Sequence, residues 1–139
     1  MCVFAICFAT QDSARTSDDE NNRAIFSEEF GFVVNERIPL DVTIGRVHVA
    51  VITTEVRASG RDTYRLTFRL EAENPKGHDQ TIAVRIEVLD ERGDLIRSVE
   101  TTKDIEEKES KKLKIVLHLD SPPLEIVESF HLEMQAWDD

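Results

Sequence analysis

Two stretches in the middle of the chain alternate between apolar and polar side chains. Their apolar positions are Leu66, Phe68, Leu70 and Ala72 in the first stretch, and Ile82, Val84, Ile86 and Val88 in the second. A period of two is typical of a β-strand with one buried face. An Asn-Pro-Lys-Gly segment separates the two stretches. The pattern therefore predicts two strands whose apolar faces close on a common core.

The same alternation predicts further strands. We expect them near residues 30–34, 42–56, 95–99, 113–119 and 129–137. Gly93 marks a hairpin turn, whereas Pro122 and Pro123 end a strand because proline cannot donate a ladder hydrogen bond. Residues 101–112 mix opposite charges, so a crossover loop is expected, with one helical turn as the alternative. About seven strands with short connections predict an all-β fold, an immunoglobulin-like (fibronectin III-like) antiparallel β-sandwich.

Matching the apolar faces across two expected hairpins predicts their registers. In the first hairpin Val51 stands opposite Phe68, because a slip of one residue would set Arg69 against the core valines. In the second, residues 113–119 pair with residues 129–137. That register sets His118 opposite His131 on the outer face of the hairpin.

The histidine pair is the candidate metal site. Two facing imidazoles could hold Zn²⁺ or Cu²⁺ if a carboxylate joined them, and Glu133 is close to His131 in sequence. A zinc site needs at least three protein ligands. We therefore name His118 and His131 as the metal-ligand candidates, and two surface histidines as the alternative interpretation.

Catalytic signatures do not occur in the sequence. It contains no Gly-x-Ser-x-Gly elbow, Walker loop, Gly-x-Gly-x-x-Gly, His-Glu-x-x-His or Cys-x-x-Cys motif. No pair of carboxylates can be selected as general acid and base among so many. We expect a protein that is not an enzyme and has no cofactor, with a small hydrolase whose site is built from loops as an alternative.

The first thirty residues change from apolar to polar. Residues 2–9 are continuously apolar but too few to span a bilayer, and Cys7 and Ala9 are small residues of the kind that signal peptidase accepts. We predict a signal peptide over residues 1–9, truncated at its start, with an N-terminal strand of the sandwich as the alternative. Residues 10–29 are acidic and predict a flexible linker, which leaves residues 30–139 for the β-sandwich domain.

The net charge of the chain makes some classes of binding partner unfavourable. The chain has 28 acidic and 17 basic residues, a net charge of −11 and a pI near 4.8. Such a charge opposes binding to nucleic acid and to anionic lipid, and no integral membrane segment is expected in the mature chain. The acidity itself indicates solubility and low self-association, with cation binding or a basic partner as the alternative. A protein partner is expected. The solvent-facing Arg65, Arg69 and Arg85 are candidates to contact it, with ordinary surface charge as the alternative.

Residues 44–120 resemble the FxLYD-type and related immunoglobulin-like domains of bacterial envelope proteins. Asn74 matches an Asn that closes a strand, Gly93 matches the turn glycine, and the motif positions are Ile86, Val88, Leu89 and Asp90. The resemblance implies an extracytoplasmic, non-catalytic accessory or interaction unit and carries over no binding residues. We therefore expect a periplasmic or secreted binding or assembly module that recognises a protein, for example by pairing an exposed edge strand.

Overall fold

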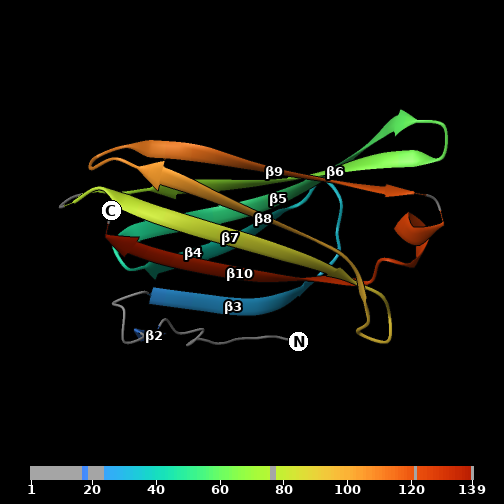
Figure 1. The fold of residues 1–139 in the computed structure, drawn as a ribbon, viewed down its shortest axis with the longest axis horizontal. Coiled ribbons are helices and arrows are strands. Elements are labelled where there is room, and N and C mark those ends of the chain that lie inside the picture. The colour runs from blue at the N-terminus through green and yellow to red at the C-terminus, as the bar shows by residue number, and fades with distance from the viewer. Residues whose placement is uncertain (1–16, 19–23, 76–77, 121, 139) are drawn as a thin grey trace.

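Two antiparallel sheets lie face to face in the computed structural model, which describes residues 17–18, 24–75, 78–120 and 122–138 (Figure 1). The five-stranded sheet has the order β2-β3-β10-β7-β8, and the four-stranded sheet has the order β4-β5-β6-β9. The predicted all-β antiparallel sandwich is confirmed. The predicted leader, residues 1–9, lies outside the described residues.

The described residues form nine strands and one short 3₁₀ helix, so the strands exceed the predicted seven. No helix in these ranges is long and apolar enough to cross a membrane. The elements are β2 (Ser17–Asp18), β3 (Ala24–Gly31), β4 (Arg37–Ile44), β5 (Val47–Gly60), β6 (Thr63–Glu73), β7 (Gln80–Leu89), β8 (Leu95–Ile105), β9 (Ser110–Asp120), η1 (Pro123–Ile126) and β10 (Ser129–Asp138).

Apolar side chains from both sheets form one core. The inward positions predicted in β6, β7, β9 and β10 are buried, and most of them are completely inaccessible to solvent. Three aromatic rings are in contact between the layers. The ring of Phe130 lies 5.2 Å from that of Phe68 in the other sheet and 5.5 Å from that of Phe30 on β3, so edge and face contacts add to simple burial.

The sandwich begins earlier than predicted. Residues 24–29 were expected in the acidic linker, yet β3 starts at Ala24 and pairs along its length with β10. Ala24 and Phe26 are each only 3% exposed. The polar run Ser27-Glu28-Glu29 hides the strand in the sequence. Ser27 and Glu29 lie on the outer face, and Glu28 is exposed although it stands opposite the buried Leu132.

The predicted register of β5 with β6 is wrong. Val51 stands opposite Glu71 rather than Phe68, and Phe68 faces Thr54. The register shifts between Val49 and Val51, which is the signature of a β-bulge. One extra residue moves the inward face of β5 from odd to even positions, so Val49 and Ile52 both reach the core.

The predicted hairpin between residues 113–119 and 129–137 does not form. Strand β9 pairs with β6, whereas β10 lies between β3 and β7 in the opposite sheet. The proline-containing connection that carries η1 crosses between the sheets instead of turning within one. The charged segment 101–112 is also mostly strand, because β8 continues to Ile105 and β9 starts at Ser110.

Asn74 joins the two crossovers at one end of the sandwich. Its buried Nδ2 donates to the carbonyl oxygens of His78, at 2.7 Å, and Ile105, at 3.1 Å. Its backbone N–H donates to Glu109 O at 2.9 Å, and its carbonyl accepts from Lys108 N at 2.6 Å. The connection from β6 to β7 is thereby tied to the connection from β8 to β9.

We expect Phe26→Ala to lower the free energy of unfolding by about 3–5 kcal/mol, because it empties a core position on β3. Urea denaturation measures the change. Leu95→Ala is the control, since Leu95 is 57% exposed and its truncation should cost no more than about 0.5 kcal/mol. Equal, small effects of the two substitutions would contradict the placement of β3 in the sandwich.

Candidate functional site

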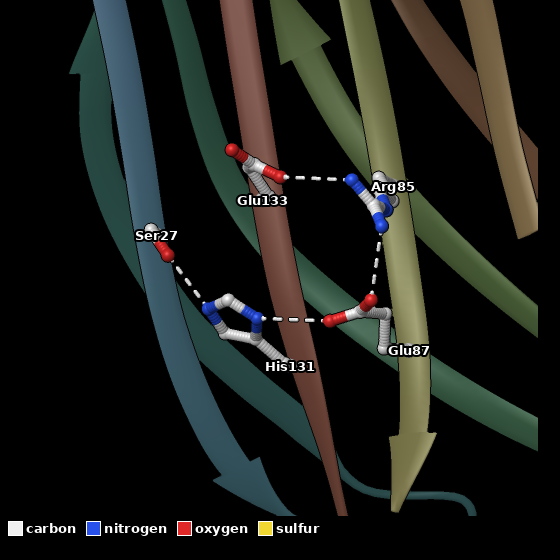
Figure 2. A network of polar contacts seen from close by, with 5 residues as sticks. All are labelled: Ser27, Arg85, Glu87, His131 and Glu133. Carbon is white, nitrogen blue, oxygen red and sulfur yellow. Dashed lines mark hydrogen bonds and ion pairs between the residues drawn. The ribbon is translucent and has the colours of Figure 1, made fainter. Parts of the chain in front are cut away.

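His131 lies in a polar network on the outer face of the five-stranded sheet (Figure 2). Because Phe130 and Leu132 point into the core, His131 on β10 points outward. Its direct cross-strand neighbour is Glu87 on β7, and Ser27 on β3 reaches it from the other side. All three strands therefore contribute to the network.

The contacts form a hydroxyl–imidazole–carboxylate chain. Ser27 Oγ lies 2.6 Å from His131 Nε2, and His131 Nδ1 lies 3.4 Å from Glu87 Oε1. Arg85 holds the second oxygen of Glu87 at 3.1 Å and approaches Glu133 at 3.8 Å. With its proton on Nδ1, facing Glu87, the imidazole can accept the Ser27 hydroxyl proton at Nε2.

This order of groups is the one that activates a serine nucleophile. The surroundings differ from those of a hydrolase, since Ser27 lies within a strand and faces Glu133 across the ladder with β10. Three hollows in the described part of the chain are lined by other side chains. No local sequence motif indicates the Ser27–His131–Glu87 arrangement, because Ser27 and Glu87 precede His131 by 104 and 44 residues.

His118 lies on the outer face of the other sheet, so the structure does not bring the predicted metal ligands together. It stands opposite Arg65 on β6, and Arg65 stands opposite Arg57 on β5. We call Arg57, Arg65 and His118 the basic row. In the described part of the chain no three His, Cys, Asp or Glu side chains gather closely enough to hold a metal ion.

The two arginines of the basic row have no ion-pair partner among the described residues, whereas most other arginines do. Five of the nine described arginines pair with a carboxylate, and three of the four that do not lie on the β5–β6 hairpin. The paired ones are Arg37, Arg46, Arg69, Arg85 and Arg92, and the others are Arg57, Arg61, Arg65 and Arg97. Arg65 Nε is also shielded from solvent without a hydrogen-bond acceptor.

The basic row stands on a projecting part of the molecule. The tip of the β5–β6 hairpin extends beyond the body of the sandwich (Figure 1, green). Residues 57–62 are all exposed. Asp62 in the turn and Asp120 at the end of β9 are the carboxylates at this end of the ladder, and neither forms an ion pair with the described arginines. Three arginines against these two aspartates leave a small positive balance at this end, in a chain of net charge −11.

A hollow at the other end of the same sheet face has a different character. It is lined by His48, Glu71, Glu73, Lys111 and Lys112, with smaller residues between them. His48 lies 2.7 Å from Asp41 Oδ1 and 3.8 Å from Glu73 Oε1. Lys111 donates to the carbonyl oxygen of Asp104 at 2.8 Å. Glu71 also pairs with Arg37 and Lys111 with Glu109, so most charged groups of this hollow have a partner, in contrast to Arg57 and Arg65.

Comparisons with known proteins identify no family for this chain. No family model matches the chain, and no curated protein is similar to it. Among solved structures, a β-glucuronidase from glycoside hydrolase family 2 is similar over 51% of this chain and 7% of that chain, with 14% identity and a TM-score of 0.45. The enzymatically active domain of tailspike protein 4 of bacteriophage CBA120 is similar over 86% of this chain and 18% of that chain, with 12% identity and a TM-score of 0.25. The chain spans less than a fifth of either protein, and neither similarity supports an argument about function.

We expect Arg57→Glu to raise the free energy of unfolding by about 0.5 kcal/mol. The substitution places a negative charge, in place of a positive one, across the ladder from Arg65. Arg69→Glu is the matched control with the same change in net charge. It breaks the 3.1 Å pair with Glu55 and should lower the free energy by a similar amount. Denaturant titrations at low salt measure both. If both variants lost stability, the claim that Arg57 and Arg65 repel each other without a compensating carboxylate would be wrong.

Proposed function

We propose that this protein is a non-catalytic binding or assembly module that recognises a protein partner at the tip of its β5–β6 hairpin. The observation that carries the proposal is the basic row, in which Arg57 and Arg65 stand opposite each other and form no ion pair with a described carboxylate. Acidic residues outnumber basic ones by 28 to 17 in the chain, so counter-charges are plentiful elsewhere. Like charges on facing positions of a ladder reduce stability, and a partner would remove that cost when it binds.

The chemistry of the hairpin suits an interface. Arginine is among the residues that contribute most to binding energy at protein interfaces. Complementary charge also speeds the encounter of two proteins and selects between partners. The exposed residues 57–62 bring these groups forward on a narrow projection that another surface can enclose.

We further propose that the module works outside the cytoplasm, in the periplasm or in the medium. The apolar run of residues 2–9, followed by a polar segment, supports export. The resemblance of residues 44–120 to FxLYD-type envelope domains supports the same location.

Site-specific photocrosslinking tests the recognition surface. A photoreactive side chain replaces Ser59 at the hairpin, or the exposed Ser98 on β8 as a control, in the native host. After fractionation of cytoplasm, envelope and medium, we expect a protein adduct from position 59 that is absent from position 98 and lost in the Arg57→Glu background. The adduct should lie outside the cytoplasm. Equal adducts from both positions, or none from position 59, would refute recognition at this surface.

Hydrolysis of an ester or amide is the second candidate function, favoured by the Ser27–His131–Glu87 chain. In such a reaction Ser27 Oγ would attack the acyl carbon while His131 Nε2 accepts its proton, and Glu87 would hold the imidazole in place. The bond to the alcohol or amine would break as His131 returns that proton to it, and water would then hydrolyse the acyl-serine. The step also needs donors directed at the developing oxyanion. The position of Ser27 within a paired strand makes recognition the better-supported function.

We expect the chain to hydrolyse 4-nitrophenyl acetate no faster than its Ser27→Ala variant, which keeps every surface histidine. Release of 4-nitrophenolate measures the rate. Turnover that both Ser27→Ala and His131→Ala abolish, while the His118→Ala variant retains it, would overturn this expectation and establish a serine hydrolase.

A further inference from the structure

We infer that the partner presents an extended acidic peptide segment, which crosses the strands along the basic row. This inference rests on the proposed function and specifies the chemistry of the partner. Adjacent strands lie about 4.8 Å apart, so the three side chains of the row extend over roughly 10 Å. Alternate side chains of an extended peptide repeat about every 7 Å, which allows two carboxylates to face the row at once.

Carboxylates match the groups that the row offers. A guanidinium binds a carboxylate through two parallel N–H···O hydrogen bonds, and it is charged at every physiological pH. Arg65 has no acceptor among the described residues and its Nε is screened from water, so its outer nitrogens are the ones that an incoming carboxylate can reach. Arg57 is exposed beside it, and Arg61 in the adjoining turn adds a third guanidinium.

Charge elsewhere on the same face favours a short peptide over a long polyanion. Along β6, the outward positions change from Arg65 and Arg69 to Glu71 and Glu73 towards the other end of the sheet. Arg69 is already paired with Glu55. A nucleic acid or an anionic bilayer would meet these carboxylates and the net charge of −11, whereas a segment that crosses only at the hairpin avoids them.

Fluorescence anisotropy with the full 139-residue chain tests the inference. The probe is a labelled short peptide of alternating aspartate and threonine, and the same peptide with asparagine in place of aspartate is the neutral comparison. We expect binding of the acidic peptide alone, weakened by salt. The double variant Arg57→Gln/Arg65→Gln should bind about tenfold more weakly or worse, since each loses charge-assisted hydrogen bonds.

The control is Arg97→Gln/Lys103→Gln on β8, which makes the same change in net charge and should bind within about twofold of the unmodified chain. Because Arg65 is half-buried, Arg57→Gln alone is tested as well and should still weaken binding about threefold. Equal weakening in both double variants would overturn the inference, as would tighter binding of a single-stranded oligonucleotide or of phosphatidylserine vesicles through the same row. A crosslink from position 59 without any binding of the acidic peptide would refute the acidic segment and leave protein recognition standing.

Discussion

The buried amide of Asn74 is the constraint on which the arrangement of the sandwich depends. It binds the carbonyl oxygens of His78 and Ile105, while its backbone pairs with Lys108 and Glu109, so two crossovers between the sheets are fixed at one point. These crossovers carry β7 and β8 into one sheet and return β9 to the other. Because β9 returns beside β6, His118 joins Arg65 and Arg57 rather than His131.

Alternation in the sequence predicted which side chains face the core, because a period of two fixes the face of a strand whatever its neighbours are. The inward residues of β6, β7, β9 and β10 are those expected. Alternation does not determine which strand lies alongside, since any strand with an apolar face satisfies the same ladder. For this reason the prediction of a hairpin that sets His118 opposite His131 was wrong. The predicted register of β5 with β6 is already off by two residues at Val49, which faces Ala72, and the bulge near Ala50, which has no local signal, adds one more.

For the candidate sites too, the sequence predicted which face a side chain lies on but not which side chains lie together. Sequence reasoning placed His118, His131 and Arg65 on outer faces, and they do lie there. It missed that Ser27 belongs to the fold, because a polar run conceals β3, and it missed the alignment of Arg57 with Arg65, which requires the bulged register. The two polar arrangements also differ physically. The charged groups around His131 form ion pairs with one another, whereas Arg57 and Arg65 form none among the described residues.

The central claim is that the uncompensated basic row is a binding surface for acidic groups. Two-dimensional NMR of the ¹⁵N-labelled chain, titrated with the alternating aspartate peptide, tests it most directly because every described amide is observed at once. The account predicts shifts confined to residues 57–65 on the hairpin and to 114–118 on β9. Shifts centred on the hollow at His48, Lys111 and Lys112, or no shift at the hairpin, would contradict it.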